Sequence, residues 1–177
     1  MNGTGQGSVL THHLHLFQVQ GPRGHNANRR PGVTTKENDC TIRPAEGEDG
    51  AALSVLFAQL GYPNPDGEVA VRLAEPEPAR EVLVASLHGR IQGVLVWHRL
   101  QPMHLAPAWG LISALVVDEG ARGEGIGALL LAVAEQRAAA LGCCQLELSS
   151  SLKREGAHRF YLAQGYSERP KRFVKAV

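Results

Sequence analysis

Three glycines at alternate positions, placed directly before a long apolar segment, constrain the fold of this chain more than any other feature. They are Gly123, Gly125 and Gly127 in the stretch DEGARGEGIGALLLAVAEQRAAALG (residues 118–142), and Arg122 precedes them. Alternate glycines remove side chains from a turn, so that successive amide N–H groups converge on one point. Apolar residues with helical spacing follow: Ile126, Leu129, Leu130, Val133 and Ala134. A helix that begins inside the loop adds the positive end of its dipole, and the segment therefore predicts an anion site suited to phosphates.

A dinucleotide-binding turn is the formal alternative for this loop. Gly123, Gly125 and Ala128 satisfy its G-x-G-x-x-[GA] pattern, and Glu147 lies on the next predicted strand. Two observations oppose it. Five residues separate the preceding strand from the first glycine, and only 50 residues follow Gly127. A nucleotide-triphosphate loop is excluded because no Gly-Lys-Ser/Thr follows the glycines.

The composition of the chain changes near residue 40. Residues 1–39 are rich in glycine and have little apolar periodicity, so we expect a flexible N-terminal tail there and one folded domain over 40–177. No apolar run approaches the roughly 20 residues of a membrane span. The net charge of +1 gives no reason to expect nucleic acid or a membrane as a partner. The cysteines, Cys40, Cys143 and Cys144, fit neither a disulfide framework nor a CxxC metal site, which favours the cytoplasm and no metal.

Apolar periodicity and turn residues divide the folded part into strands and helices. We expect strands at 41–43, 81–87, 90–100, 109–118, 144–150 and 172–177. We expect helices that end at Gly61, span 67–74, end near Leu141 and end at Gly165. Gly93 predicts a bulge, and the strand at 109–118 reads as a central strand buried on both faces. This order predicts an α+β fold in which a mixed sheet carries helices on both faces.

Four segments match one known family in the family's own order. The motif [RQ]-x-x-G-x-[GA] fits Arg122–Gly127. LVVDEGARG fits the L-x-V strand end and the loop that leads into this motif. AHRFYLAQGY fits the helix A-x-x-[FY]-Y-x-x-x-G-[FY], and IRPA with the following helix fits the opening. On these segments residues 41–177 resemble the GNAT superfamily of acyl-CoA-dependent N-acetyltransferases. The resemblance implies a mostly antiparallel sheet splayed between its fourth and fifth strands, the acyl-CoA N-acyltransferase fold.

The resemblance also implies how acetyl-CoA binds. The main chain of Leu115, Val116 and Val117 would pair with the pantetheine arm like an extra strand. The loop would cradle the pyrophosphate through the residues Arg122, Gly123, Glu124, Gly125, Ile126, Gly127 and Ala128. Tyr161 matches the tyrosine that lies near the CoA sulfur. Arg154 would either reach a CoA phosphate or simply be solvated.

The implied reaction moves an acetyl group from acetyl-CoA to a primary amine of a small molecule or peptide, by direct attack in a ternary complex. The amide of Val117 would polarise the thioester carbonyl, and the Tyr161 hydroxyl would protonate the sulfur. An amine with a pKa of about 10.4 is almost entirely protonated at neutral pH, so a base is expected. Many relatives carry a Glu where this chain has Ser113 and Ala114. His98 and His104 are candidates for the base, and a water chain to solvent is the alternative.

The acceptor segments are expected at 62–80 and 101–109. Carboxylates in the first segment would suit a cationic acceptor; they are Asp66, Glu68, Glu75 and Glu77. Two other functions remain open: a non-catalytic acyl-CoA-binding regulatory domain, and an NAD-binding oxidoreductase. A homodimer is compatible with the sequence.

Overall fold

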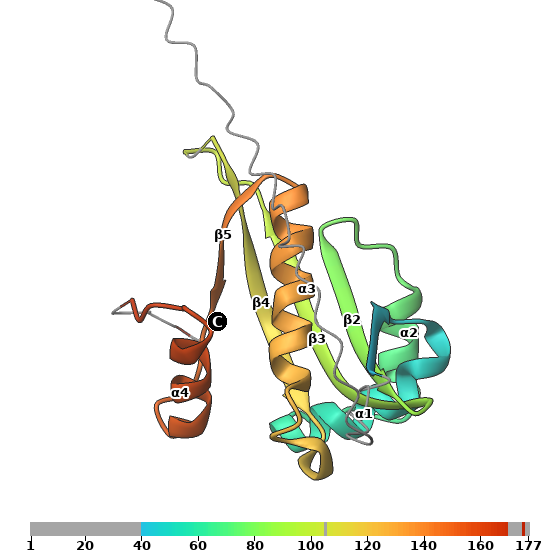
Figure 1. Ribbon diagram of the computed structural model, residues 1–177. Helices are drawn as coiled ribbons and strands as arrows, with labels where there is room; N and C mark the ends of the chain where they lie inside the picture. The colour runs from blue at the N-terminus through green and yellow to red at the C-terminus, as the bar shows by residue number, and fades with distance from the viewer. Residues whose placement is uncertain (1–39, 105, 170–174, 176–177) are drawn as a thin grey trace, which may run out of the picture. The chain divides into compact units, whose positions relative to one another are not determined.

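Five strands with alternating apolar residues form one sheet in the computed structural model, which describes residues 40–104, 106–169 and 175. The strands are β1 (Cys40–Pro44), β2 (Arg80–Leu87), β3 (Arg90–Leu100), β4 (Ala108–Val117) and β5 (Cys143–Leu148). They lie in this order, and each neighbouring pair is antiparallel except β4–β5, which is parallel (Figure 1). The expected α+β fold is therefore confirmed. The predicted tail at 1–39 lies outside the described residues, as does the predicted strand at 172–177 apart from Lys175.

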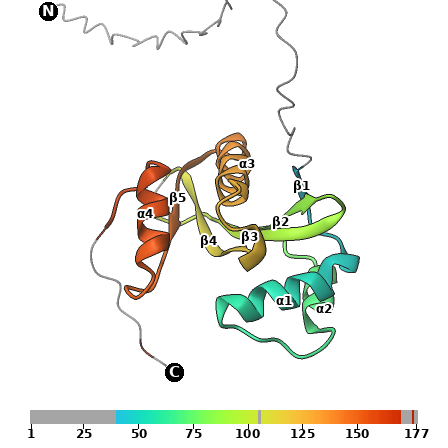
Figure 2. The same ribbon diagram turned by 60° about the horizontal axis from the view of Figure 1, so that its bottom comes forward.

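Helices cover both faces of this sheet. α1 (Gly50–Leu60) and α2 (Glu68–Ala74) lie on one face, and α3 (Ile126–Ala140) lies on the other (Figure 2). α4 (Glu155–Ala163) lies beside β5. The glycines expected to end α1 and α3 follow them with positive φ values, 100° at Gly61 and 76° at Gly142. No helix in the described part of the chain is long and apolar enough to cross a membrane.

The two faces of the sheet use alternate side chains of the same strands. On β3, Leu95 and Trp97 pack with α3, whereas Val94 and Val96 pack with α1 and α2. Trp97 is almost fully buried, and its indole nitrogen donates a hydrogen bond of 3.0 Å to Glu81 on β2. The period-2 pattern of the sequence therefore builds one core on each side of the sheet.

Two β-bulges interrupt the antiparallel pairs. The first lies in β3 beside Gly93, where the sequence predicts it. The second lies in β4, where Ile112 and Ala114 face consecutive residues of β3 and Ser113 is the extra residue. Before this bulge, Ile112 packs in the core between the sheet and α3, called here the α3 core. After it, Ala114 packs in the core between the sheet and helices α1 and α2, called here the α1 core. The bulge thus changes which face each later residue of β4 occupies.

β4 and β5 separate part-way along their length. Their pairing ends where Ile112 faces Leu148, while β4 continues to Val117. Beyond Ile112, β4 pairs with β3 alone among the described strands. The splay expected between the fourth and fifth strands is confirmed. The prediction that β4 is buried on both faces is wrong, because Ser113 is exposed and Leu115 half-buried along this opening.

A charged contact fixes the start of α1 against β1. The buried carboxylate of Asp49, the N-cap residue of α1, accepts hydrogen bonds of 2.7 and 2.8 Å from Arg43 and one of 2.8 Å from the amide of Glu46. The Arg43 bonds hold the pKa of this carboxyl below its usual range, with the Glu46 amide adding to the effect and burial opposing it. The carboxylate therefore stays ionised where it anchors the helix.

Candidate functional site

The separation of β4 from β5 leaves a cavity of about 170 Å³, called here the gap cavity. β4, the segment after β5, α4 and the end of α1 contribute its walls. The lining residues are Leu60, Tyr62, Ile112, Ser113, Ala114, Leu115, Leu148, Ser149, Ser150, Ser151, Arg154, Ala157 and Tyr161. The predicted residues Leu115, Arg154 and Tyr161 therefore come together in one cavity, from two elements distant in sequence.

The glycine loop joins the end of β4 to the start of α3. Gly123 and Gly125 have φ values of 89° and 83°, a left-handed conformation that side chains disfavour. Gly125 is the N-cap of α3, and no side chain caps the helix there. The first amides of a helix have no intrahelical partners, so those of Ile126–Ala128 are available to an anion. A Cβ added at Gly123 or Gly125 would meet nothing within 4 Å, which leaves open space for a ligand to approach.

The side chains of the loop divide between solvent and core. Arg122 and Glu124 are exposed, and the Arg122 Nε donates a hydrogen bond of 3.2 Å to the carbonyl of Val117. Ile126 is buried in the α3 core and anchors the first turn of the helix. A Cβ at Gly127 would lie 3.2 Å from the Phe160 ring, so this glycine allows α4 to approach. The left-handed backbone thus explains Gly123 and Gly125, and the close approach of Phe160 explains Gly127.

Two of the three β4 residues predicted to face the pantetheine arm turn their main chain toward the opening. The amide of Asp118 donates to the Gln92 carbonyl at 2.8 Å and therefore points to β3. Main-chain groups of an antiparallel strand alternate between its two edges, so those of Val117 and Leu115 point away from β3. Val116 instead turns its main chain toward Val94 and buries its side chain in the α1 core, which corrects the prediction for that residue.

Tyr161 lies on α4 with its ring half-buried at the gap cavity. It packs edge-on against Phe160 and Tyr166, with ring centroids 5.3 and 5.8 Å apart. Burial raises the pKa of the Tyr161 hydroxyl, and the positive charge of Arg154 opposes this shift. The phenol therefore stays protonated at neutral pH.

A second cavity of about 610 Å³, called here the helix cavity, lies between α1, α2 and the sheet. Its lining residues are Leu53, Phe57, Leu60, Gly61, Tyr62, Pro63, Asn64, Val69, Arg72, Leu73, Arg80, Val82, Val96, His98, Ser113 and Ala114. It shares Leu60, Tyr62, Ser113 and Ala114 with the gap cavity. Ser113 and Ala114 are adjacent at the β4 bulge, so the bulge is where the two cavities meet.

The predicted acceptor segments have different outcomes. Residues 62–80 line the helix cavity as expected, but through Arg72 and Arg80 and not through the four carboxylates predicted for a cationic acceptor. Among the described residues, no acidic side chain lines either cavity. The described residues of 101–109 line neither cavity. They lie where β3 connects to β4, at the opposite end of β4 from the glycine loop. His104, in that segment, is thereby set apart from the site.

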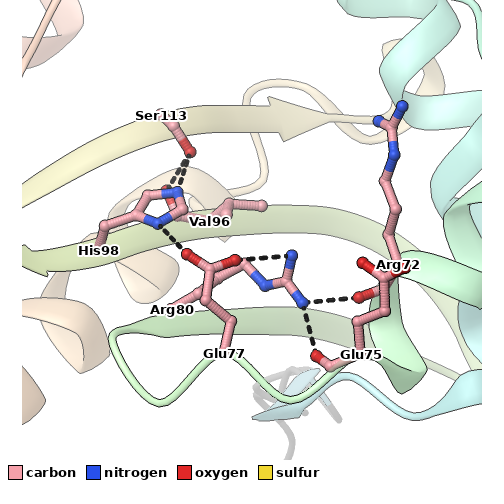
Figure 3. A network of polar contacts seen from close by, with 7 residues as sticks. All are labelled: Arg72, Glu75, Glu77, Arg80, Val96, His98 and Ser113. Atoms are coloured by element: carbon pink, nitrogen blue, oxygen red, sulfur yellow. Dashed lines mark hydrogen bonds and ion pairs between the residues drawn. The ribbon is translucent and has the colours of Figure 1, made fainter.

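His98 lies in the helix cavity within a network that reaches the bulge (Figure 3). Its Nε2 is 3.1 Å from Ser113 Oγ, and its Nδ1 is 3.4 Å from a carboxylate oxygen of Glu77. The other oxygen of Glu77 lies 3.0 Å from the guanidinium of Arg80. The contacts of Ser113 and Glu77 are not predicted from the sequence, although a serine where many relatives carry a glutamate is a usable signal.

No group of three His, Cys, Asp or Glu side chains that could hold a metal occurs in residues 40–104, 106–169 and 175. The arrangement therefore consists of a loop with exposed helix-start amides, a strand edge turned away from β3, a protonated phenol and two cavities that share a wall. Such a site can hold a long phosphorylated ligand along the loop and strand while a second molecule reaches its end from the other cavity.

Comparison with known proteins agrees with this geometry. Residues 52–166 match the Acetyltransferase (GNAT) family. The aminoalkylphosphonate N-acetyltransferase of Salmonella typhimurium strain LT2 is 35% identical over 143 residues, which cover 78% of this chain and 92% of that protein. A GNAT family acetyltransferase of Staphylococcus aureus has a TM-score of 0.67 at 22% identity, over 78% of this chain and 98% of that one. Glucosamine-6-phosphate N-acetyltransferase of Arabidopsis thaliana has a TM-score of 0.68 at 20% identity, over 77% and 97%.

Proposed function

This chain belongs to the GNAT family of acetyltransferases, and from that premise we propose that it moves an acetyl group from acetyl-CoA to a primary amine by direct attack in a complex of both substrates. The observation that carries the proposal is the wall shared by the two cavities at Ser113 and Ala114. A thioester in the gap cavity and an amine in the helix cavity would meet there. The domain at 40–177 would hold the whole site.

The glycine loop and β4 supply the contacts for acetyl-CoA in this proposal. The amides from Gly123 to Ala128 bind the pyrophosphate at the positive end of α3, and Arg122 lies beside them as a second positive group. The main chain of Leu115 and Val117 pairs with the pantetheine arm along the edge that β5 leaves. Arg154 lines the gap cavity and donates a hydrogen bond to the Leu60 carbonyl. Its main proposed role is therefore to shape the cavity, and contact with a CoA phosphate is secondary.

The chemistry uses the hydroxyl of Tyr161, which lines the gap cavity, and the amide of Val117, which lies further along β4. The neutral amine attacks the thioester carbonyl, and the Val117 amide stabilises the negative charge that forms on the carbonyl oxygen. As the carbon–sulfur bond breaks, the Tyr161 hydroxyl gives its proton to the thiolate. Burial keeps this phenol protonated until that step, because it raises its pKa.

The charge of the helix cavity supports a small acceptor that carries an anionic group. Arg72 and Arg80 line this cavity, whereas Glu68 and Glu77, with which they form ion pairs, do not. Arg72 is exposed and makes a contact of 3.3 Å with Asn64, which also lines the cavity. The relative from Salmonella typhimurium acts, by its name, on aminoalkylphosphonates. We therefore favour an amine that bears a phosphonate, phosphate or carboxylate over a peptide or a diamine.

The dinucleotide interpretation of the glycines is not retained, because the described sheet contains a single parallel pair and a dinucleotide fold needs a mostly parallel one. A non-catalytic acyl-CoA-binding domain remains the contrasting outcome of the experiment that follows. It would use the same loop and strand edge without turnover.

The test measures CoA release by the full chain with acetyl-CoA and a panel of amines: 2-aminoethylphosphonate, ethanolamine, a diamine and a short peptide. We expect the highest kcat/KM with the phosphonate. Arg72→Gln should raise KM for the phosphonate and leave KM for ethanolamine unchanged. Calorimetric titration with acetyl-CoA is the companion measurement. Binding of acetyl-CoA without CoA release from any amine would replace the enzyme by the non-catalytic domain.

A further inference from the structure

We propose that Ser113, His98 and Glu77 form a proton path from the acceptor amine, in which His98 takes the proton through the Ser113 hydroxyl and Glu77 positions the imidazole. The proposal rests on the acetyl transfer proposed above. That reaction needs a base, and the sequence holds no acidic residue between Trp97 and Asp118. The path supplies the base from a neighbouring strand and a loop.

Ser113 stands where the two substrates would meet. It is the extra residue of the β4 bulge, and it lines both the gap cavity and the helix cavity. Its Oγ also lies 3.4 Å from the Val96 carbonyl, a long contact that competes only weakly for its proton. A hydroxyl donates one hydrogen bond and accepts others, so it can accept from an amine while it donates to an imidazole.

His98 contacts Glu77 through one ring nitrogen and Ser113 through the other. Nδ1 faces the Glu77 carboxylate at 3.4 Å, and an ionised carboxylate only accepts, so this contact selects the tautomer with a proton on Nδ1. Nε2 then carries a lone pair and lies 3.1 Å from Ser113 Oγ. The imidazole is thereby set to accept a proton from the hydroxyl. The contact to Glu77 is longer than an ordinary hydrogen bond, as such pairs often are before substrate binds.

Glu77 is itself held in place by Arg80 (Figure 3). One nitrogen of this guanidinium lies 3.0 Å from the second oxygen of Glu77, and the other donates to the carbonyls of Arg72 and Glu75, at 2.6 and 3.1 Å. Arg80 therefore ties the carboxylate to the main chain between α2 and β2. Glu77 acts through His98 and is a positioning residue.

The charged groups around His98 come from each element packed against it. Glu77 faces it from the loop before β2, while Arg80 on β2 and Arg72 on α2 line the same cavity. β4 contributes the neutral Ser113. Of these charged groups, Glu77 is the one that contacts the imidazole and has the sign opposite to that of a protonated ring.

The step balances in protons and bonds. The ammonium form of the acceptor gives one proton to Ser113 Oγ as the hydroxyl proton passes to His98 Nε2, and His98 later releases it to solvent. The nitrogen–carbon bond then forms and the carbon–sulfur bond breaks, with the Tyr161 proton going to the thiolate. After it attacks, the nitrogen loses one more proton, which returns to Tyr161 and restores its hydroxyl. Amide, free CoA and one released proton are the products.

The experiment compares acceptors of high and low amine pKa in Ser113→Ala, His98→Gln and Glu77→Gln. For an acceptor that is protonated at pH 7, His98→Gln and Ser113→Ala should lower kcat about 100-fold, with KM for acetyl-CoA unchanged. For an acceptor that is already neutral at pH 7, the same variants should lose only a few-fold. Raising the pH should likewise restore activity with the first acceptor. A purely structural defect would lower kcat equally for both acceptors, and that result would overturn the path.

Matched controls lie outside both cavities. His104→Gln removes an exposed imidazole and Asp66→Asn an exposed carboxylate, and both should match the wild type. Mass spectrometry during turnover provides a further decision: an acetyl group trapped on Ser113 would make this residue a nucleophile and overturn the relay. Unfolding temperatures of all variants identify any loss that is due to stability.

A readout without turnover separates this proposal from the proposed function. The nitrogen NMR shifts of His98 in the full chain should show the proton on Nδ1 in the wild type and in Glu77→Gln, and a mixture of tautomers in Glu77→Ala. A proton on Nε2 in the wild type would refute the path even if acetyl transfer is observed. If no amine releases CoA, the proposed function fails by its own test, whatever the tautomer.

Discussion

The guanidinium of Arg154 donates a hydrogen bond of 2.6 Å to the carbonyl oxygen of Leu60, which joins the start of α4 to the last turn of α1. Leu60 lines both cavities and Arg154 lines the gap cavity, so this bond crosses the region where the two meet. The same guanidinium acts on the Tyr161 hydroxyl, whose pKa it lowers against the larger effect of burial. The side chain of Arg154 thus contributes both to the shape of the site and to the pKa of Tyr161.

Replacing Arg154 by Met should raise the pKa of Tyr161 further, because the opposing positive charge is removed. The measurement is the absorbance of tyrosinate against pH, taken as the difference between chains with and without Tyr161→Phe. Arg159→Met, an exposed arginine on the same helix, is the control and should leave this titration unchanged. A lower Tyr161 pKa in Arg154→Met would contradict the assignment.

Tyr161→Phe should lower kcat by about 100-fold while KM for both substrates stays within a few-fold. In the proposed mechanism the hydroxyl protonates the thiolate only as the carbon–sulfur bond breaks, so its loss should affect the transition state more than binding. Because burial raises the phenol pKa, the alkaline fall in wild-type rate should lie above the ordinary tyrosine value of 10.0 and vanish in the variant. Steady-state rates from neutral to alkaline pH provide the measurement. Full kcat in the variant would remove Tyr161 from the chemistry.

Gly125→Ala should weaken acetyl-CoA binding at least about tenfold, or 1.4 kcal/mol. The left-handed φ of 83° costs a side chain about 1 kcal/mol, and the amides of the first turn of α3 shift when the loop relaxes. Gly142→Ala is the matched control: its φ is 76°, its added Cβ also meets nothing within 4 Å, and it lies at the other end of α3. Calorimetry should find equal losses of stability and a loss of affinity in Gly125→Ala alone.

Gly127→Ala should destabilise the packing of α4 on α3, because the new methyl would lie 3.2 Å from the Phe160 ring. We expect a loss of about 1 kcal/mol in the free energy of unfolding, typical of mild overpacking. The double variant Gly127→Ala, Phe160→Leu should recover part of this loss relative to the sum of the single changes. Urea unfolding of the wild type, the two single variants and the double variant measures the coupling. Strictly additive losses would contradict the contact between position 127 and Phe160.

Asp49→Ala should lower the free energy of unfolding by about 2 kcal/mol at pH 7, since it removes three hydrogen bonds and leaves Arg43 without its partner. The native pKa of this carboxyl is below its unfolded value near 3.8, so its stabilisation is present above that pH and lost as the pH falls through the native pKa. The difference between the two chains should therefore shrink below pH 4. Glu48→Gln, an exposed neighbour, is the control for urea titrations at several pH values.

Much of the fold follows from local patterns in the sequence. The spacing of Leu53 and Leu56 fixes the buried face of α1, and the glycines at 61 and 142 end helices because their backbone is left-handed. The glycine loop is equally local, since its amides and the start of α3 belong to one short segment. These features depend on residues close together in the chain, where spacing alone carries the information.

The parts that were missed depend on pairing between strands. The bulge at Ser113 is invisible in WGLISALVVD, because it exists only in the register of β4 against β3. Glu77 reaches His98 because β2 brings Arg80 opposite that histidine, a contact across 21 residues that no periodicity encodes. Residues 101–109 appeared suited to an acceptor, but the same register carries them to the far end of the hairpin. The expected acidic lining is also wrong: Glu68 and Glu77 form ion pairs with Arg72 and Arg80, and the two arginines line the helix cavity.

The early end of the β4–β5 ladder at Ile112 has a consequence for the lifetime of the protein. β5 pairs with β4 along only part of that strand, so we expect amide exchange and proteolytic nicking to begin in this C-terminal portion. A bound acyl donor would lie in the open seam and hold it shut, adding its own binding free energy to the fold. If the proposed acetyl transfer is the activity of this chain, depletion of the donor would shorten the lifetime of the protein in the cell.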